Sequence, residues 1–315
     1  MKSYGKELFS LIAKKYSTLI DDIKFFVDVL SRRPLKAIVI NKRLTNDPAY
    51  VIELLKSYNP IPVKWSNYIY YSTNERLGNN LLHHLGLYYV MDLVNTILPL
   101  VLSNKDTFFP LIVDVSASPG GKTYLFSNRL YPDKPLIIAN EPFKSRVPAL
   151  LSNINRLLLD NVIVTRYRGE SFPRVNGLKF ILFDAPCSSA NLFYKNPRIV
   201  LDNISSKVRY LSKTQKRIIK NLYKILEPGG LVIYSTCTFT VEECEEVIDY
   251  ALRIGFDIIK PSLTYLKYQN GIEEWNGKVF DSRVKYSVRI MPHINYELYH
   301  GNIGLLYLAI LRRGY

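Results

Sequence analysis

The chain has 315 residues and 48% of them are hydrophobic, which supports a large folded core and excludes a largely disordered protein. It has no apolar run long enough to cross a membrane, no signal-peptide pattern at its start and only three cysteines. We therefore expect a cytoplasmic protein without a disulfide framework. The formal net charge of +15 favours a polyanionic partner such as RNA.

Residues 1–75 are predicted to form a small α/β unit that binds RNA. Apolar residues recur at helical spacing over 3–30. Runs rich in β-branched and aromatic residues predict strands at 35–41 and 64–71, and Asp47 followed by Pro48 marks the start of a helix over 47–58. The unit is expected to resemble an RNA-recognition motif.

A different pattern covers residues 76–315, the predicted catalytic domain. The apolar stretch 83–102 is predicted to be a long helix, and apolar strand-like runs then alternate with helix-length segments. This alternation indicates a mostly parallel, doubly wound α/β sheet of Rossmann-like type. The runs are 109–115, 135–141, 161–167, 179–185 and 230–236, followed by later runs at 287–293 and 303–313, of which one is expected to be an antiparallel edge strand.

Residues 111–130 combine a strand that ends at Asp114, a glycine turn and the start of a helix. A P-loop needs glycine where this chain has Ser116, and the G-x-G-x-x-G of dinucleotide sites is absent. We favour a ligand with one adenosine and no pyrophosphate, S-adenosylmethionine, with Glu141 at the next strand end accepting the ribose hydroxyls. A P-loop nucleotide hydrolase and a turn without a ligand remain alternatives.

Cys187 and Cys237 each follow a strand of the predicted sheet, so both are expected to face one crevice beside the cofactor. A thiolate that adds to carbon 6 of cytosine makes carbon 5 nucleophilic toward a sulfonium methyl group, and a second thiol can assist release. Asp184 is placed to hydrogen-bond the ring at N3 or at the exocyclic amine. The alternative is that both cysteines are buried structural residues.

The motifs DVSASPGGKT, ANEP, DAPCSS, EPGG and YSTCTF, in this order, resemble the Sun-domain family of RNA cytosine-5 methyltransferases over about residues 35–315. The resemblance implies that Cys237 attacks the base and that Cys187 promotes product release. Asp184 and Lys122 would then support the cytosine.

The resemblance also implies a cofactor site at the glycine turn. Ser118, Pro119, Gly120 and Gly121 would hold the methionine part of S-adenosylmethionine, and Glu141 its ribose. The predicted cofactor set is completed by Asp114, Lys122, Arg146, Gly169 and Asp184. The family usually has an Asp-Gly pair near the adenine, whereas this chain has Arg168-Gly169-Glu170, which leaves that contact to Glu170 or to a backbone amide.

A basic segment lies between Lys195 and Lys224 and contains one acid, Asp202. At the helical angle, its basic residues from Lys213 onward fall on one stripe and apolar residues on the opposite one. We therefore expect a surface that follows the RNA backbone. The candidate RNA-binding residues are Lys195, Arg198, Lys213, Lys216, Arg217 and Lys220.

Together these features predict an enzyme that methylates carbon 5 of cytidine in RNA, with tRNA favoured over rRNA. The four histidines show no ligand spacing, so no metal is expected, and a monomer is the default. The alternatives are a non-catalytic RNA-binding scaffold in ribosome assembly and the P-loop hydrolase.

Overall fold

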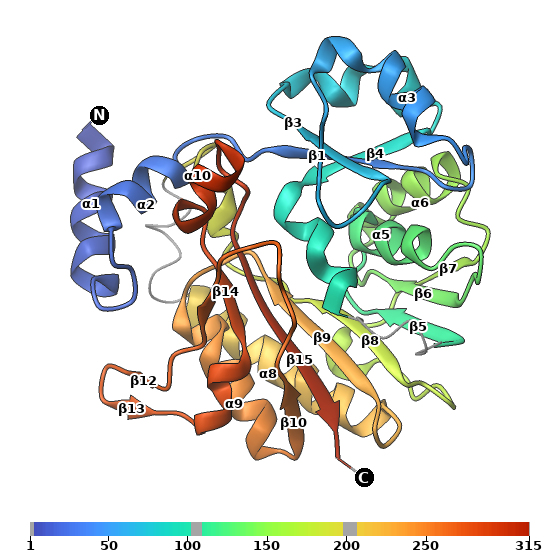
Figure 1. The fold of residues 1–315 in the computed structure, drawn as a ribbon. Helices are drawn as coiled ribbons and strands as arrows, with labels where there is room; N and C mark the ends of the chain where they lie inside the picture. The colour runs from blue at the N-terminus through green and yellow to red at the C-terminus, as the bar shows by residue number, and fades with distance from the viewer. Residues whose placement is uncertain (1–2, 102–108, 198–206, 315) are drawn as a thin grey trace.

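A computed structural model describes residues 3–101, 109–197 and 207–314 of the chain. Its core is a nine-stranded mixed sheet with strand order β11-β14-β15-β9-β8-β5-β6-β7, in which β10 also pairs with β15 (Figure 1). The strands are β5 (Leu111–Asp114), β6 (Leu136–Asn140), β7 (Val162–Thr165), β8 (Phe180–Asp184), β9 (Leu231–Thr236), β10 (Phe256–Ile259), β11 (Gln269–Asn270), β14 (Val288–Ile290) and β15 (Leu306–Arg313).

The five strands from β7 to β9 are parallel, and β15 pairs antiparallel with β9. The chain runs outward from β5 to β6 and β7, then returns to β8 on the other side of β5. This reversal of strand order makes the crevice between β5 and β8 the expected ligand site. The predicted doubly wound sheet is confirmed. The expected antiparallel edge strand is wrong, because β14 and β10 continue the sheet beyond β15, and β11 continues it beyond β14.

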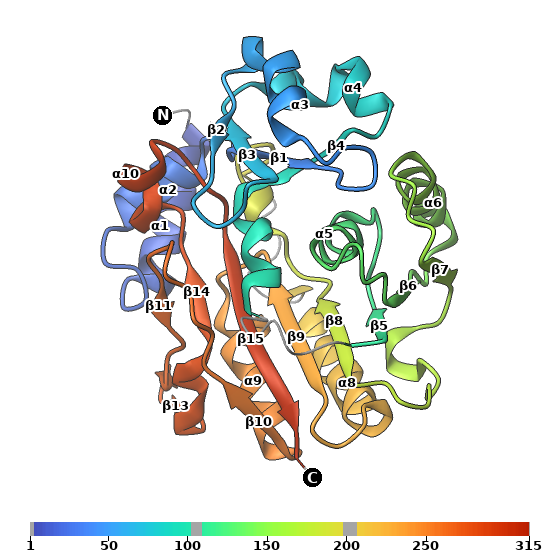
Figure 2. The ribbon, with the colours of Figure 1, turned by 45° about the vertical axis from the view of Figure 1, so that its right-hand side comes forward.

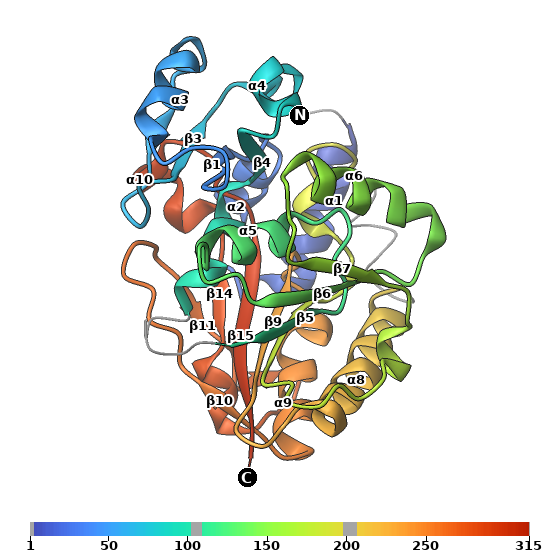
Figure 3. The ribbon, with the colours of Figure 1, turned by 90° about the vertical axis from the view of Figure 1, so that its right-hand side faces the viewer.

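Helices cover both faces of the sheet (Figure 3). On one face α5 (Gly121–Arg129) and α6 (Val147–Arg156) pack against side chains such as Ile112, and on the other α8 (Val208–Ile225) and α9 (Glu245–Arg253) pack against side chains such as Val113. Neighbouring residues of β5 thus pack into the cores on opposite faces of the sheet, because successive side chains of a strand point to opposite faces. No helix among the described residues has the length and apolarity needed for a membrane span.

The remaining elements are short or peripheral. The first two helices pack on the α8–α9 side of the sheet. These elements are α1 (Ser3–Tyr16), α2 (Ile23–Leu30), α10 (Tyr296–Tyr299), β12 (Glu274–Trp275), β13 (Lys278–Val279), and the 3-10 helices η1 (Lys56–Tyr58), η2 (Glu75–Asn79), η3 (Leu93–Val101), η4 (Lys144–Arg146), η5 (Gly169–Ser171), η6 (Ala190–Leu192), η8 (Val241–Glu243), η9 (Ser282–Tyr286) and η10 (His293–Asn295).

The N-terminal part contains a separate four-stranded antiparallel sheet with strand order β2-β3-β1-β4 (Figure 2). Its elements follow one another as β1 (Lys36–Ile40), α3 (Pro48–Leu54), β2 (Ile61–Pro62), β3 (Ile69–Ser72), α4 (Leu81–His84) and β4 (Tyr88–Asp92). This βαββαβ order is the split βαβ arrangement expected of a unit that resembles an RNA-recognition motif. Asp47 caps α3 through the amides of Ala49 and Tyr50, as its place before Pro48 predicts.

The long helix predicted over 83–102 is wrong. The structure has strand β4 there, followed by η3. Tyr88 to Asp92 pair with the whole of β1, with Val90 opposite Ile38. The sequence of a short apolar run does not distinguish a strand from a helix. Here the run forms a strand because it pairs with β1. The small sheet therefore includes a strand that lies after residue 75.

The helical prediction for 3–30 holds except for a break between α1 and α2. Asp22 caps α2 by accepting a hydrogen bond from the amide of Phe25 at 2.9 Å. The acceptor at this position starts a new helix instead of continuing the first.

Both faces of the small sheet are buried. Ala37 and Val39 of β1 pack with η3 and α5, whereas Ile38 and Ile40 pack under α3. Proteins with RNA-recognition motifs stack bases on an open sheet face. In this chain most of that face is covered by η3 and α5, so it cannot serve as a broad RNA platform.

Candidate functional site

The two cysteines predicted to act together lie side by side. Strands β8 and β9 pair in parallel with Asp184 opposite Ser235, so the segments that follow them leave the sheet at the same edge. The Sγ atoms of Cys187 and Cys237 are 3.3 Å apart, and both residues are partly exposed. Hydrogen bonding to Cys237 and burial raise the pKa of the Cys187 thiol well above its ordinary value. Either sulfur can donate in this contact, and the raised pKa of Cys187 favours its neutral thiol form.

Both cysteines line a cavity of about 630 Å³, here called the main cavity, whose size is typical of sites for small molecules. It extends from the thiols past Glu141 to Gly169, beneath the first turns of α8. The other predicted site residues on its wall are Ser118, Arg146 and Asp184. A smaller cavity of about 260 Å³ shares Ser118 and Asp184 with it and is also lined by Pro119, Gly121 and Lys122.

An ion pair joins the glycine turn to β8. The Lys122 Nζ lies 2.5 Å from Asp184 Oδ2, and Ser235 donates its hydroxyl to Asp184 Oδ1 at 2.9 Å. Burial lowers the pKa of Lys122, but the adjacent Asp184 carboxylate raises that pKa more, so the ammonium stays charged. The pair places one cation and one anion at the boundary of the two cavities.

The glycine turn requires its glycines for two reasons. Gly120 has φ +103°, a left-handed value that favours glycine, and a Cβ on Gly121 would lie 3.0 Å from the Tyr89 ring. Asp114 lies below the turn and accepts hydrogen bonds from Thr123 Oγ1 at 2.7 Å and from the Ser116 amide at 3.3 Å. Asp114 and Gly120 line neither cavity, so they shape the turn from behind.

Glu141 presents a buried, incompletely bonded carboxylate to the main cavity. Its Oε1 accepts the amide of Phe143 at 2.9 Å, whereas Oε2 has no hydrogen-bond donor, although Arg146 Nη1 lies 3.3 Å away. Arg146 also donates to the carbonyl of Ser118 at 2.7 Å, which ties the glycine turn to the end of β6. An unpaired buried acceptor fits a ligand that carries hydroxyl groups.

The far end of the main cavity is formed by Arg168, Gly169 and Glu170. A Cβ on Gly169 would meet Ile218 of α8 at 3.1 Å, so glycine allows this close approach. The Glu170 side chain is 22% exposed, and its recorded partner is the exposed Arg168 guanidinium at 3.7 Å. A largely buried carboxylate thus faces the cavity at the end farthest from the thiols.

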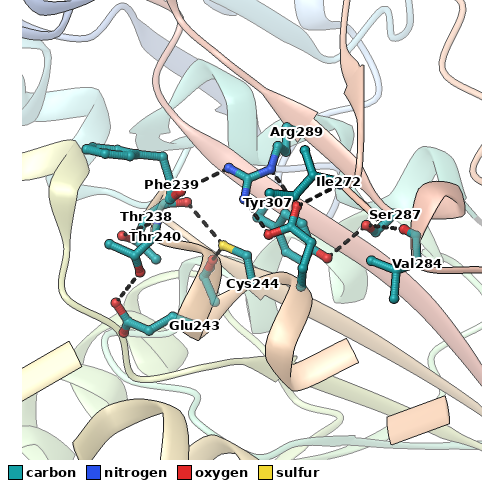
Figure 4. A network of polar contacts seen from close by, with 12 residues as sticks. Thr238, Phe239, Thr240, Glu243, Cys244, Ile272, Val284, Ser287, Arg289 and Tyr307 are labelled. Carbon is teal, nitrogen blue, oxygen red and sulfur yellow. Dashed lines mark hydrogen bonds and ion pairs between the residues drawn. The ribbon is translucent and has the colours of Figure 1, made fainter. Parts of the chain in front are cut away.

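Glu243 joins the segments that carry the two cysteines, a role that the sequence did not reveal. It accepts hydrogen bonds from the Ser188 amide at 2.9 Å, Thr240 Oγ1 at 2.8 Å and Gln215 Nε2 at 3.2 Å. Figure 4 shows its contact with Thr240. Burial raises the pKa of Glu243 despite these donors. Its position six residues after Cys237 was the only hint of this role in the sequence. The spacing of residues does not predict which groups donate hydrogen bonds to it.

A second buried group fixes the chain beyond Cys237. Arg289 of β14 forms a fully buried ion pair with Glu245 of α9 and donates to the carbonyl of Phe239 at 2.9 Å (Figure 4). Cys244 is buried beside this network, with its Sγ 3.6 Å from the carbonyl of Thr238. Cys244 lines neither cavity, which agrees with a structural thiol.

Two further residues that the sequence did not single out hold the Cys237 segment against the small sheet. Asn191 donates its amide to the carbonyl of Cys237 at 3.1 Å and its side chain to Asp92 at 2.6 Å. Asp92 also pairs with Lys36 at 2.5 Å. These contacts link β1 and β4 to the site, and no local sequence pattern predicts them.

The basic stripe lies on α8. Lys213, Arg217 and Lys220 are exposed, while Ile218, Ile219 and Leu222 are buried on the opposite side. Lys216 is partly buried and its Nζ lies 2.9 Å from Glu246. Lys195 is exposed before the helix, and Arg198 lies outside the described residues. Within the described ranges no cluster of three or more potential metal-binding side chains occurs.

Known proteins resemble this chain in sequence. A family described as 16S rRNA methyltransferase RsmB/F matches residues 98–297. The tRNA (cytosine(49)-C(5))-methyltransferase of Pyrococcus abyssi is 32% identical over 93% of this chain and 94% of its own length. The 25S rRNA (cytosine-C(5))-methyltransferase nop2 of Schizosaccharomyces pombe is 30% identical over 73% of this chain, which spans only 38% of that protein.

Solved structures show the same fold. A methyltransferase homolog from Pyrococcus horikoshii superposes with a TM-score of 0.78 at 22% identity and covers 99% of both chains. The structure titled NSun6 from Pyrococcus horikoshii with SFG gives 0.74 at 18% identity and covers 98% of both.

The doubly wound sheet with a cavity at its switch point defines a Rossmann-like methyltransferase fold. The chain belongs to the RsmB/F methyltransferase family, because that family matches over half of its length. This confirms the predicted family and the S-adenosylmethionine-dependent enzyme class, and it decides against the P-loop hydrolase.

Breaking the buried Arg289–Glu245 pair should destabilise the protein strongly. Arg289→Met leaves the Glu245 carboxylate buried without its cation, which should lower the free energy of unfolding by about 3–5 kcal/mol in urea titrations. The control is Lys56→Met, whose pair with Glu53 is exposed on both sides and should contribute about 1 kcal/mol or less. Equal losses in the two variants would contradict the assignment.

Asp114 should give a stability dependence on pH. Burial raises the pKa of Asp114 to about 6, so this group stabilises the folded state most below its unfolded pKa and the contribution is lost as pH rises through about 6. Relative to wild type, Asp114→Asn should therefore gain about 2 kcal/mol of unfolding free energy between pH 4.5 and 7.5. Urea titrations at both pH values measure this, and the exposed-site control Asp133→Asn should stay parallel to wild type.

Proposed function

We propose that this chain transfers a methyl group from S-adenosylmethionine to carbon 5 of a cytidine in tRNA through a covalent adduct at carbon 6. That it is an RNA cytosine-5 methyltransferase follows from its family and relatives. The observation that supports the covalent route is the pair of sulfur atoms 3.3 Å apart on the cavity wall, beside the Lys122–Asp184 pair.

The main cavity suits S-adenosylmethionine, which supplies the electrophilic methyl group when bound. Glu141 is proposed to accept the ribose hydroxyls through its unpaired Oε2. Gly121 and the backbone around Ser118 would accommodate the methionine part, where a side chain at 121 would collide with Tyr89. The residues that would hold the ribose and methionine parts line the two cavities that meet at Asp184, beside the thiols, so the methyl group would be supplied there.

The two thiols and the two charged groups beside them divide the chemistry between them. Cys237 is proposed to add to carbon 6 of cytosine, which moves electron density to carbon 5. Cys187, whose sulfur lies beside that of Cys237, is proposed to promote the last step, in which the proton leaves carbon 5 and the bond between Cys237 and carbon 6 breaks. Asp184 and Lys122, held 2.5 Å apart, would bind the edge of the ring that carries N3 and the exocyclic amine.

The choice of tRNA rests on coverage. The Pyrococcus abyssi relative, named for cytosine 49 of tRNA, matches along nearly its entire length, whereas the chain spans about a third of the two next relatives, which act on rRNA by name. We propose cytoplasmic action as a monomer. Transfer of labelled methyl groups to tRNA transcripts, compared with rRNA fragments and mapped by bisulfite sequencing, tests the substrate, and preferential labelling of rRNA would overturn it.

The two cysteines should behave asymmetrically when replaced. Cys237→Ala removes the proposed nucleophile, so methyl transfer to RNA should fall by at least about a thousandfold and no covalent complex should form. Cys187→Ala should instead accumulate protein linked to RNA, seen as a band shift that survives denaturant. Cys244→Ala is the matched control and should form no stable adduct, because its thiol lies outside both cavities. An adduct in Cys237→Ala would reverse the two roles.

Glu170 should recognise the adenine amino group. The wild-type protein should bind S-adenosylhomocysteine at least about tenfold more tightly than S-inosylhomocysteine, which presents an oxygen in place of that amine. In Glu170→Ala this ratio should fall to about one, as measured by calorimetry. Glu227→Ala is the control, since this acid pairs with Arg174 away from the cavity. An unchanged ratio in Glu170→Ala would place the adenine elsewhere.

A further inference from the structure

A third cavity, here called the seam cavity, lies between the small sheet and the catalytic part. Its volume is about 190 Å³, and it shares no lining residue with the main or the smaller cavity. It is bounded by the turn that precedes β3, by the C-terminal half of α5 and by η3. The lining residues are Val39, Lys42, Trp65, Ser66, Asn67, Tyr68, Ile69, Thr96, Pro99, Leu100, Leu125, Asn128 and Arg129.

The apolar wall of the seam cavity belongs to the inner face of the small sheet. Val39 and Ile69 point to the core shared with the catalytic part, and Trp65 packs against that same core. The cavity is therefore a portion of the sheet face that η3 and α5 leave uncovered. Aromatic and aliphatic side chains on such a face stack nucleobases in single-stranded RNA readers. A planar ring is the shape this wall accommodates.

The rim of the cavity carries two cations. The Lys42 ammonium lies 4.9 Å from the centre of the Tyr68 ring, and Arg129 is exposed at the end of α5. Burial lowers the pKa of Lys42 first, and repulsion by Arg129 lowers it further. No ion pair of either side chain is recorded within the described ranges. An anion between them would relieve this repulsion.

A hydrogen-bond donor in the wall is also left without a partner. The Trp65 Nε1 is buried and forms no hydrogen bond in the structure, although its ring is held 6.0 Å from that of Tyr265. Buried donors are normally paired, so a bound molecule that supplies an acceptor is expected here. Base edges and ribose oxygens are such acceptors.

We infer that the seam cavity binds one unpaired nucleotide of the substrate RNA. Its base would lie against Trp65 and Val39, and its phosphate would lie between Lys42 and Arg129. The volume is well below the roughly 300–1,000 Å³ of sites that take drug-sized ligands, so it suits one ring system and no larger cofactor. The identity of the RNA rests on the proposed function, but the nucleotide chemistry of the cavity does not. The small unit thus contacts RNA at a pocket, although most of its sheet face is covered.

The chain offers a direct optical test because it has two tryptophans. In Trp275→Phe, Trp65 is the only tryptophan, and a single-stranded uridine 12-mer should quench its fluorescence by about a third or more on saturation. Trp65→Phe keeps Trp275, which stacks with Tyr16, and should show less than about a tenth of quenching. Saturation is followed independently by the anisotropy of the labelled 12-mer. Bound RNA without quenching of Trp65 would overturn the inference.

Variants that remove one positive charge each test the contact with the phosphate. Lys42→Gln and Arg129→Gln should each weaken binding of the 12-mer about three- to tenfold and reduce the slope of log affinity against log salt by about one. Lys260→Gln, an exposed lysine outside the cavity, is the control and should leave the slope unchanged. Unchanged slopes in both rim variants would contradict the proposal.

A titration with free uridine monophosphate tests whether the cavity binds a free nucleotide instead of RNA. If it quenches Trp65 as tightly as the 12-mer, the cavity takes a free nucleotide and not RNA, which would also overturn the inference. The readouts require neither S-adenosylmethionine nor turnover. Loss of methyl transfer with Trp65 quenching intact would therefore count against the proposed function alone, whereas intact transfer without quenching would count against the seam cavity alone.

Discussion

The parallel pairing of β8 with β9 is the constraint on which the site depends. With Asp184 fixed opposite Ser235, the chain must leave both strands at the same edge, and the segments that follow carry Cys187 and Cys237 to a sulfur–sulfur distance of 3.3 Å. A shift of one residue in this register would turn every side chain of the shifted strand to the other face of the sheet. The thiol pair, the Asp184 contact with Lys122 and the wall of the main cavity all follow from that register.

Buried charges keep the two cysteine segments in place. Glu243 receives donors from Ser188 and Thr240, one on each segment, and Arg289 holds the carbonyl of Phe239 while it neutralises Glu245. Such groups add little net stability, since their desolvation offsets much of their attraction, but they tolerate only one arrangement of their partners. Their effect here is geometric, because they connect the two segments that follow β8 and β9 to each other and to β14.

The small sheet has been adapted to a position beside the catalytic part. Its split βαβ topology matches that of a free-standing RNA reader, yet Ala37 and Val39 on its inner face pack against η3 and α5. Asp92 at the end of β4 is bound by Asn191, whose amide in turn donates to the carbonyl of Cys237. Because the sheet and the cysteine segment share these contacts, the position of one is fixed with respect to the other.

The sequence by itself determined the alternation of strands and helices, the glycine turn, the thiols at two strand ends and the basic stripe of α8, because each is written in local spacing. Only the tertiary structure decided that residues 88–92 form a strand, since an apolar run takes the conformation that its neighbour β1 pairs with. It also decided the donors of Glu243, the ion pair of Lys122 and the seam cavity. These features depend on residues that are far apart in the chain. Local spacing does not predict which distant side chains will come into contact in the folded protein.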